Sequence, residues 1–110
     1  MGRQIREYKS LGTTAVSLST DGKHPEKVLC VMAHWGVAPT TAENFKITYD
    51  SSGTYYDANA VVFDPSTGSN TDALWTPDEE MILSPTQKLT VTYTNSDART
   101  LGVIIKTEEI

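Results

Sequence analysis

The residue types best suited to nucleophilic chemistry are few in this chain. The sequence contains two histidines, His24 and His34, and one cysteine, Cys30. A hydrolytic triad needs a nucleophile beside a histidine that an acid orients, and no Gly-x-Ser-x-Gly turn is present to carry such a serine. Cys30 lies inside the most apolar run, VLCVMA, where a buried small side chain is expected rather than a reactive thiol. We therefore predict that the protein is not an enzyme and that both histidines are structural or exposed.

Metal and cofactor sites also lack the residues they need. Zinc requires three or four Cys, His or carboxylate ligands at workable spacing, and no Asp-x-Asp-x-Asp-Gly calcium loop or Gly-rich phosphate loop is present. We predict no metal and no cofactor. A bound cation is the weaker alternative, because acidic residues spaced one to a loop could converge at one end of a folded domain.

Four aromatic residues could form an exposed stacking surface for a sugar. Tyr55 and Tyr56 are adjacent, so in a strand their side chains would point to opposite faces and only one could join a given platform. The alternative is that these aromatic side chains pack in the core or at an interface. The candidate surface consists of Trp35, Tyr55, Tyr56 and Trp75.

The charge distribution is uneven along the chain. The net charge of -5 argues against sequence-independent binding of nucleic acid. Residues 1–30 hold five basic and three acidic side chains, a net of +2, whereas no Lys or Arg occurs between Lys46 and Lys88. Residues 1–10 are expected to form either an extended arm that contacts a neighbouring molecule or an edge strand of the protein's own sheet. The candidate partner contacts in this segment are Arg3, Ile5, Arg6, Tyr8 and Lys9.

Apolar residues alternate with polar ones along most of the chain. NFKITYD and KLTVTYTN show the period-two pattern of half-buried antiparallel strands, and KVLCVMAHW, apolar on both faces, predicts a central strand. Turn residues separate about eight such segments. The one helical candidate is a single turn near NTDALW, residues 70–75. The residues expected to be largely buried are Val16, Leu18, Val28, Cys30, Phe45, Ile47, Tyr49, Val91, Tyr93 and Val103.

These patterns together predict one all-β domain over residues 1–110. A length of 110 residues suits a single domain, and strands spaced near ten residues apart with turns between them are typical of a sandwich. We expect an antiparallel two-sheet sandwich of the jelly-roll type. The longest apolar run is too short to cross a membrane, and the leading residues lack the apolar region of a secretory signal, so no membrane association is expected.

Two segments of the sequence carry a family resemblance. They are APTTAENFKITYDSSGTYYDANAVVFDPSTGSNTDALWTPDE, from Ala38, and LTVTYTNSDARTLGVIIKTEEI, up to Ile110. The matching features are the Ala-Pro-Thr-Thr turn, Tyr-Asp before the next strand, Asp-Pro-Ser, Trp-x-Pro-Asp, and the Tyr-x-Asn-x-Asp turn before Gly-Val-x-Ile. In these features the chain resembles the small β-sandwich virion proteins of tailed bacteriophages, of the capsid decoration (cement) kind, over about two-thirds of its length.

The resemblance implies a non-enzymatic structural role in the virion. A decoration protein would bind the major capsid protein, or another virion protein, across neighbouring subunits and would be expected to form a homo-oligomer. Such a protein is assembled into the virion in the host cytoplasm. The alternative is a carbohydrate- or receptor-binding β-sandwich module on a virion appendage. None of the matching positions is a known active-site residue, so no functional residue is carried over.

Overall fold

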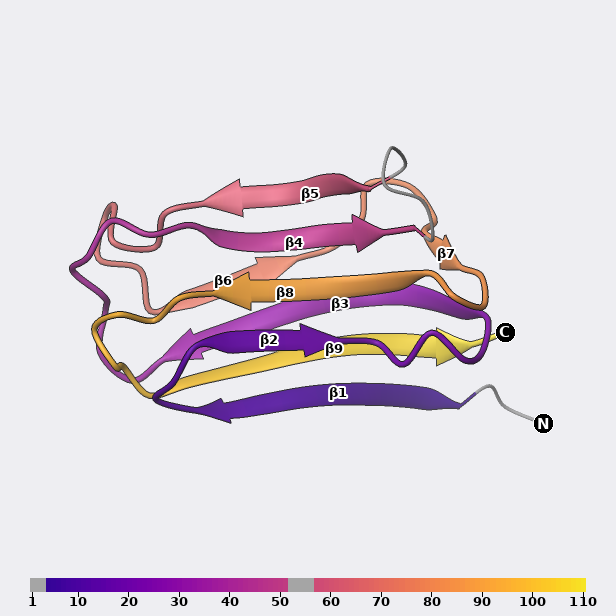
Figure 1. The fold of residues 1–110 in the computed structure, drawn as a ribbon, viewed down its shortest axis with the longest axis horizontal. Helices are drawn as coiled ribbons and strands as arrows, with labels where there is room; N and C mark the ends of the chain where they lie inside the picture. The colour runs from indigo at the N-terminus through magenta and orange to yellow at the C-terminus, as the bar shows by residue number, and fades with distance from the viewer. Residues whose placement is uncertain (1–3, 52–56) are drawn as a thin grey trace.

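The protein is a sandwich of two antiparallel sheets, shown in Figure 1. The computed structural model describes residues 4–51 and 57–110. Within these ranges the five-stranded sheet has the order β1-β9-β3-β6, with β7 also paired to β3, and the four-stranded sheet has the order β2-β8-β4-β5. The strands are β1 (Ile5–Gly12), β2 (Val16–Ser19), β3 (Glu26–Trp35), β4 (Phe45–Asp50), β5 (Ala58–Phe63), β6 (Asp72–Trp75), β7 (Ile82–Leu83), β8 (Lys88–Tyr93) and β9 (Leu101–Glu109).

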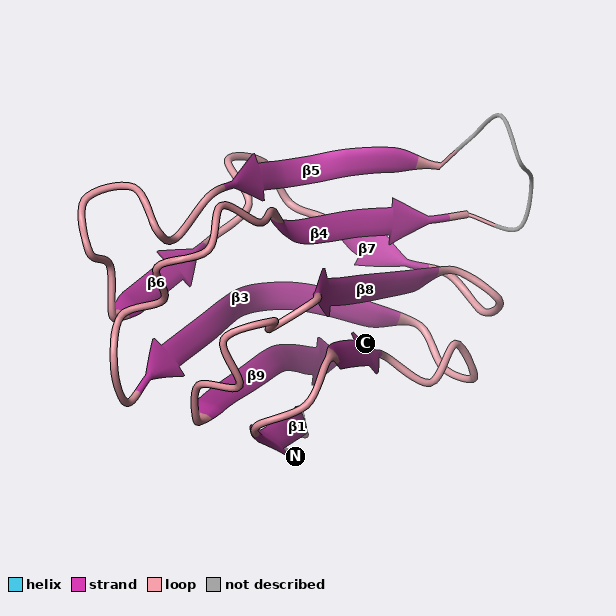
Figure 2. Cartoon of the chain, turned by 60° about the vertical axis from the view of Figure 1, so that its left-hand side comes forward, coloured by secondary structure: helices cyan, strands magenta, loops and turns pink. Residues whose placement is uncertain are grey.

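The strand order is that of a jelly roll. Four pairs are nested along the chain: β4 pairs with β5, β3 with β6, β2 with β8, and β1 with β9. This is one long antiparallel hairpin wound so that successive pairs alternate between the two sheets. Figure 2 shows the resulting layers from the side, with β8, β4 and β5 in one and β3, β9 and β1 in the other. The predicted fold class is confirmed.

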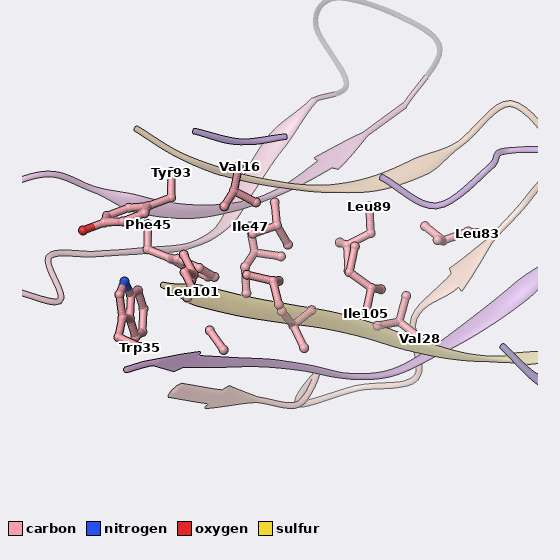
Figure 3. Packing of buried hydrophobic residues seen from close by; sticks show 14 residues of the cluster. Val16, Val28, Trp35, Phe45, Ile47, Leu83, Leu89, Tyr93, Leu101 and Ile105 are labelled. Atoms are coloured by element: carbon pink, nitrogen blue, oxygen red, sulfur yellow. The ribbon is translucent and has the colours of Figure 1, made fainter. Parts of the chain in front are cut away.

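The core lies between the sheets and consists largely of apolar side chains, with Glu26 and Thr107 among the buried polar exceptions. Phe45 and Ile47 from β4 meet Leu89, Val91 and Tyr93 from β8, as the period-two pattern predicts. Figure 3 shows Phe45, Ile47 and Leu89 on the side of the core that faces Leu101 and Ile105 of the opposite sheet. At one end the ring of Trp35 packs edge-on against Phe45 and Tyr93, with 5.7 Å between ring centroids in both pairs, a preferred aromatic geometry.

A β-bulge in β3 changes the expected core. Val28 lies opposite Thr107 and Cys30 lies opposite Lys106, so Leu29 is an extra residue in the ladder. The bulge reverses the alternation, and Val31 rather than Cys30 is buried. The prediction that Cys30 belongs to the core is therefore wrong. Seven of the other nine residues predicted for the core are buried, while Leu18 and Tyr49 are partly buried against it.

Residues 72–75 form a strand, so the prediction of a helical turn near NTDALW is wrong. β6 pairs with the free side of β3, with Trp75 opposite Val31 and Ala73 opposite Ala33. Ala73 and Trp75 pack against the core, and Leu74 points to the opposite face. Four residues are too few for local preference to decide the conformation, and pairing with β3 decides it here.

The leading segment is an edge strand of the protein's own sandwich. β1 pairs along its full length with β9, from Ile5 opposite Glu108 to Gly12 opposite Leu101. In Figure 1 it runs along one margin of the molecule. Of the two alternatives, the described part of this segment has the edge strand and not the arm, and Arg3 lies outside the described residues.

Val91→Ala should destabilise the protein by about 1–3 kcal/mol, because the side chain is fully buried and the cavity left behind cannot be filled by water. The matched control is Val62→Ala on β5, where the same methyl groups are removed from a side chain that is 47% exposed. Thermal melts of both variants check this prediction. Equal melting temperatures for the parent and Val91→Ala would contradict the register of β8.

Candidate functional site

The outer face of the five-stranded sheet carries a shallow apolar groove, called here the outer groove. It has a volume of about 770 Å³ and crosses four adjacent strands. Leu11 of β1 and Leu74 of β6 stand at its two sides and are 79% and 69% exposed. Large apolar side chains this exposed are unusual on the surface of a soluble domain when they share one patch. The lining side chains that define the outer groove are Lys9, Leu11, Met32, His34, Asp72, Leu74 and Ile104.

Strand register explains why the groove forms. Met32 lies opposite Leu74 on one side and Ile104 on the other, so three apolar side chains share one row across the sheet. In the next row Gly102 has no side chain, and the Leu11 side chain leans over it at 3.7 Å from where a Cβ would stand. The floor of the groove is therefore low at Gly102 and apolar on both sides of it.

A polar pair lies beside the apolar row. His34 Nδ1 and Asp72 Oδ1 are 2.6 Å apart across the β3–β6 pair, and both side chains are largely exposed. The hydrogen bond with His34 holds the pKa of Asp72 below its usual value. Lys9 provides a cation near the β1 side of the groove. The site thus offers an apolar surface with polar groups at its border, which is the usual composition of a protein-binding patch.

The outer groove was not predicted from the sequence. Its signal was available only in part: Leu74 is the apolar residue out of phase with Ala73 and Trp75, and Leu11 follows a charged stretch. Each of these residues alone is an ordinary surface leucine. They become one site only because β1, β9, β3 and β6 are neighbours in this order.

The predicted partner contacts on β1 divide between the two faces of the strand. Ile5 and Lys9 are exposed on the outer face. Arg6 and Tyr8 point the other way and are bound within the molecule. The Arg6 guanidinium lies 2.5 Å from Glu109 and 3.5 Å from Asp21. These two side chains are therefore held by intramolecular partners rather than presented to a neighbour.

Tyr8 belongs to a buried polar cluster around Glu26. The Glu26 side chain is 1% exposed, and its Oε1 accepts hydrogen bonds from the Tyr8 hydroxyl at 2.6 Å and the Thr107 hydroxyl at 2.8 Å. Burial, together with the Glu26 carboxylate, raises the pKa of Tyr8 to about 12. Arg6 Nε lies 3.9 Å from the same Oε1. The cluster joins β1, β3 and β9 and so fixes the edge strand to the sheet.

Tyr8→Phe should destabilise the protein by about 1–3 kcal/mol, because a buried carboxylate loses one hydrogen-bond donor. Tyr8 has a folded pKa above the ordinary value of 10.0, so its contribution is complete below pH 10 and is lost as the pH rises through about 12. The difference in melting temperature between parent and variant should therefore shrink over that interval. Tyr49→Phe is the control, since that hydroxyl has no hydrogen bond among the described residues. A difference that is constant with pH would contradict the role of Glu26.

Of the residues predicted for an aromatic surface, only Trp35 and Trp75 are among the described residues, and they do not share an exposed face. Trp35 is fully buried in the core, so its place in that surface was wrong. Tyr55 and Tyr56 lie outside the described residues. Trp75 is partly buried and, together with Tyr49, lines a second groove of about 530 Å³. The acidic run Asp78, Glu79 and Glu80 borders the same groove.

Two motifs of the family resemblance meet at one corner of the sandwich. The Asp97 carboxylate accepts hydrogen bonds from the backbone N–H groups of Thr40 and Thr41 at 2.7 and 2.8 Å and from the Thr41 hydroxyl at 2.5 Å. These bonds lower the pKa of Asp97 to about 2. Glu43 accepts hydrogen bonds from the backbone and side chain of Ser96. The Ala-Pro-Thr-Thr turn and the Tyr-x-Asn-x-Asp turn therefore hold each other in place.

Asp97→Asn should lower the melting temperature at neutral pH, because the amide replaces a charged acceptor of several hydrogen bonds. The folded pKa of Asp97 lies below the ordinary 3.8, so its contribution is present above that pH and is lost as the pH falls through about 2. Parent and variant should therefore converge at acidic pH. Melting curves between neutral pH and pH 2 test this, and a gap that persists at the acidic end would contradict it.

Over residues 4–51 and 57–110, no three His, Cys, Asp or Glu side chains are grouped so that they could hold a metal ion. The same ranges contain no helix with the length and hydrophobicity needed to cross a bilayer.

No protein-family model matches the chain, and no curated protein matches it either. An apolar groove with polar borders can bind another surface by excluding water from it.

Proposed function

We propose that the protein is a non-enzymatic structural component of a tailed-phage virion. In this role it is a capsid decoration (cement) protein that binds the outside of the shell across neighbouring subunits of the major capsid protein. The observation that carries the proposal is the outer groove, where Leu11 and Leu74 are 79% and 69% exposed. The sequence resemblance supports the part of the proposal that assigns the protein to a phage virion.

The outer groove suits adhesion to a protein surface. Its apolar row runs across the strands, so a partner segment laid along it would cover Met32, Leu74 and Ile104 together. Burial of these side chains is the favourable term, at about 25 cal/mol for each Å² removed from water. Lys9, His34 and Asp72 at the border would fix the orientation of the partner by hydrogen bonds and charge.

The mechanism is mechanical rather than chemical. A standard protein interface buries about 800 Å² on each partner, and one such contact on each of two capsid subunits makes their separation more costly. Contacts repeated over a shell act together, so a modest affinity at each site becomes a large stabilisation of the particle. The sandwich is suited to this task because its core and its turns are fixed by packing and by hydrogen bonds such as those of Asp97.

Leu74→Glu should reduce binding to undecorated capsids by about tenfold or more, because it places a charge in the apolar row that Leu74 forms with Met32 and Ile104. The matched control is Val62→Glu, which puts the same charge at a 47% exposed position of the other sheet and should bind like the parent. Cosedimentation of the protein with capsids measures both variants. Melting temperatures equal to that of the parent show that neither change acts through the fold. Undiminished binding by Leu74→Glu would exclude the outer groove as the capsid contact.

One observation favours a second candidate, a carbohydrate- or receptor-binding module on a virion appendage. The second groove combines the Trp75 and Tyr49 side chains with the carboxylates of Asp78, Glu79 and Glu80. Aromatic faces for stacking and carboxylates for sugar hydroxyls are the groups that a glycan site uses. Glycan-array binding by the parent protein, compared with its binding to undecorated capsids, separates the two candidates. Copy number in the particle also separates them, since shell decoration requires many copies and an appendage requires few.

A further inference from the structure

The edge strand β1 has a free side. β9 pairs with it on one side, and no other described strand is hydrogen-bonded to it. The backbone N–H of Glu109 donates to the carbonyl of Gln4 at 2.9 Å, so the even-numbered residues from Gln4 onward direct their backbone groups toward β9. The N–H and C=O groups of Ile5, Glu7, Lys9 and Leu11 consequently face the free side and can pair with another strand.

The side chains of the same residues form a symmetrical series on the outer face. An apolar residue stands at each end, with Ile5 50% exposed and Leu11 79% exposed. Between them stand one acid and one base, and Lys9 Nζ lies 3.5 Å from Glu7 Oε1 within the strand. From Ile5 to Leu11 the order is apolar, acid, base, apolar. In the opposite direction it is apolar, base, acid, apolar. A strand of this kind is complementary to its own antiparallel copy.

We infer that two copies of the protein associate through β1, antiparallel and about a twofold axis at Tyr8. In this register Ile5 lies opposite Leu11 of the second copy, and Glu7 lies opposite Lys9. The same contacts repeat on the other side of the axis, as an isologous interface requires. The five-stranded sheets of the two copies then become one continuous sheet by strand addition.

The free backbone groups and the charges both select this register. A twofold axis normal to the sheet keeps the faces in phase only if residues of equal parity stand opposite each other. If β1 of the second copy is shifted by two residues in one direction, Glu7 lies opposite Glu7 of that copy. If it is shifted by two residues in the other direction, Lys9 lies opposite Lys9 of that copy. Like charges directly opposite destabilise a strand pair, whereas opposite charges stabilise it. The register about Tyr8 also covers both exposed apolar side chains.

Charged residues on an edge strand usually prevent pairing between copies. Here their order has the opposite effect, because each charge meets its counterpart in the register that also pairs Ile5 with Leu11. The inference does not depend on the proposed function, since it uses only β1 and its register. It does place the two outer grooves on the same face of one sheet, side by side across the axis.

Two charge reversals test the inference. Glu7→Lys gives a strand with two bases, and Lys9→Glu gives a strand with two acids, so each variant alone should dimerise at least about tenfold more weakly than the parent. An equimolar mixture of the two variants should form a heterodimer, because each base then faces an acid again. Analytical ultracentrifugation measures the three samples. Glu7→Lys also removes the ion pair that Glu7 makes with Lys106 at 3.8 Å within the molecule. Because ion pairs between partly exposed groups contribute little to stability, circular dichroism and thermal melts should show that each variant keeps the fold.

Several results of the ultracentrifugation would overturn the inferred dimer. A parent protein that remains monomeric up to about 100 µM, a concentration that still detects weak association, overturns the inference. Variants that dimerise like the parent, or a mixture in which no heterodimer forms, overturn it as well. Loss of capsid binding by Leu74→Glu with dimerisation intact would leave this inference standing, and the reverse result would leave the proposed function standing.

Disulfide cross-linking of single-cysteine variants tests the register of the two β1 strands directly. On a Cys30→Ser background, Tyr8→Cys places two thiols opposite each other at the axis, in a non-hydrogen-bonded pair with Cα atoms about 4.5 Å apart, within the range of a disulfide. Mild oxidation should give a covalent dimer of this variant. Glu7→Cys and Lys9→Cys are the matched controls and should cross-link far less, because neither residue faces its own copy. Preferential cross-linking at either control position would overturn the register about Tyr8.

Discussion

One extra residue in β3 decides which side chains become core and which become surface. Before the bulge at Leu29, Glu26 and Val28 face inward; after it, Val31 and Trp35 do. Without the extra residue Met32 and His34 would point into the sandwich. The bulge therefore provides both the buried carboxylate that holds β1 and the apolar row of the outer groove. The buried carboxylate and the apolar row therefore depend on which side chains of β3 face inward.

The sequence predicted the sheets best where one face of a strand is buried and the other is solvated. Phe45 and Ile47, with the alternating residues of β8, specify their own orientation because a shift of one residue would expose them. β3 is apolar on both faces, so its pattern could not fix the phase, and Cys30 was placed on the wrong side. β6 has only four residues, and its conformation comes from pairing with β3, which is distant in the sequence.

The candidate site was much less predictable than the fold. Leu11, Met32 and Leu74 belong to strands separated by tens of residues, and only the jelly-roll order brings them into one groove. Glu26 could not be identified as buried, because its burial depends on hydroxyl groups of β1 and β9 that the local sequence does not reveal. The charge series of β1 was visible in the sequence, but its meaning required the knowledge that β1 is an edge.

The place of β9 in the sheet also constrains how the protein can fold during synthesis. β9 follows the other described strands along the chain, yet it lies between β1 and β3 and pairs with both. The hairpin of β4 and β5 can form early, whereas β1 must wait for a partner that is about a hundred residues away, and such non-local pairing is slow. Until translation reaches β9, the nascent chain exposes Ile5, Tyr8 and Leu11 on a strand without neighbours. Chaperone binding or premature association between nascent chains would therefore be concentrated at β1, which is translated before β9.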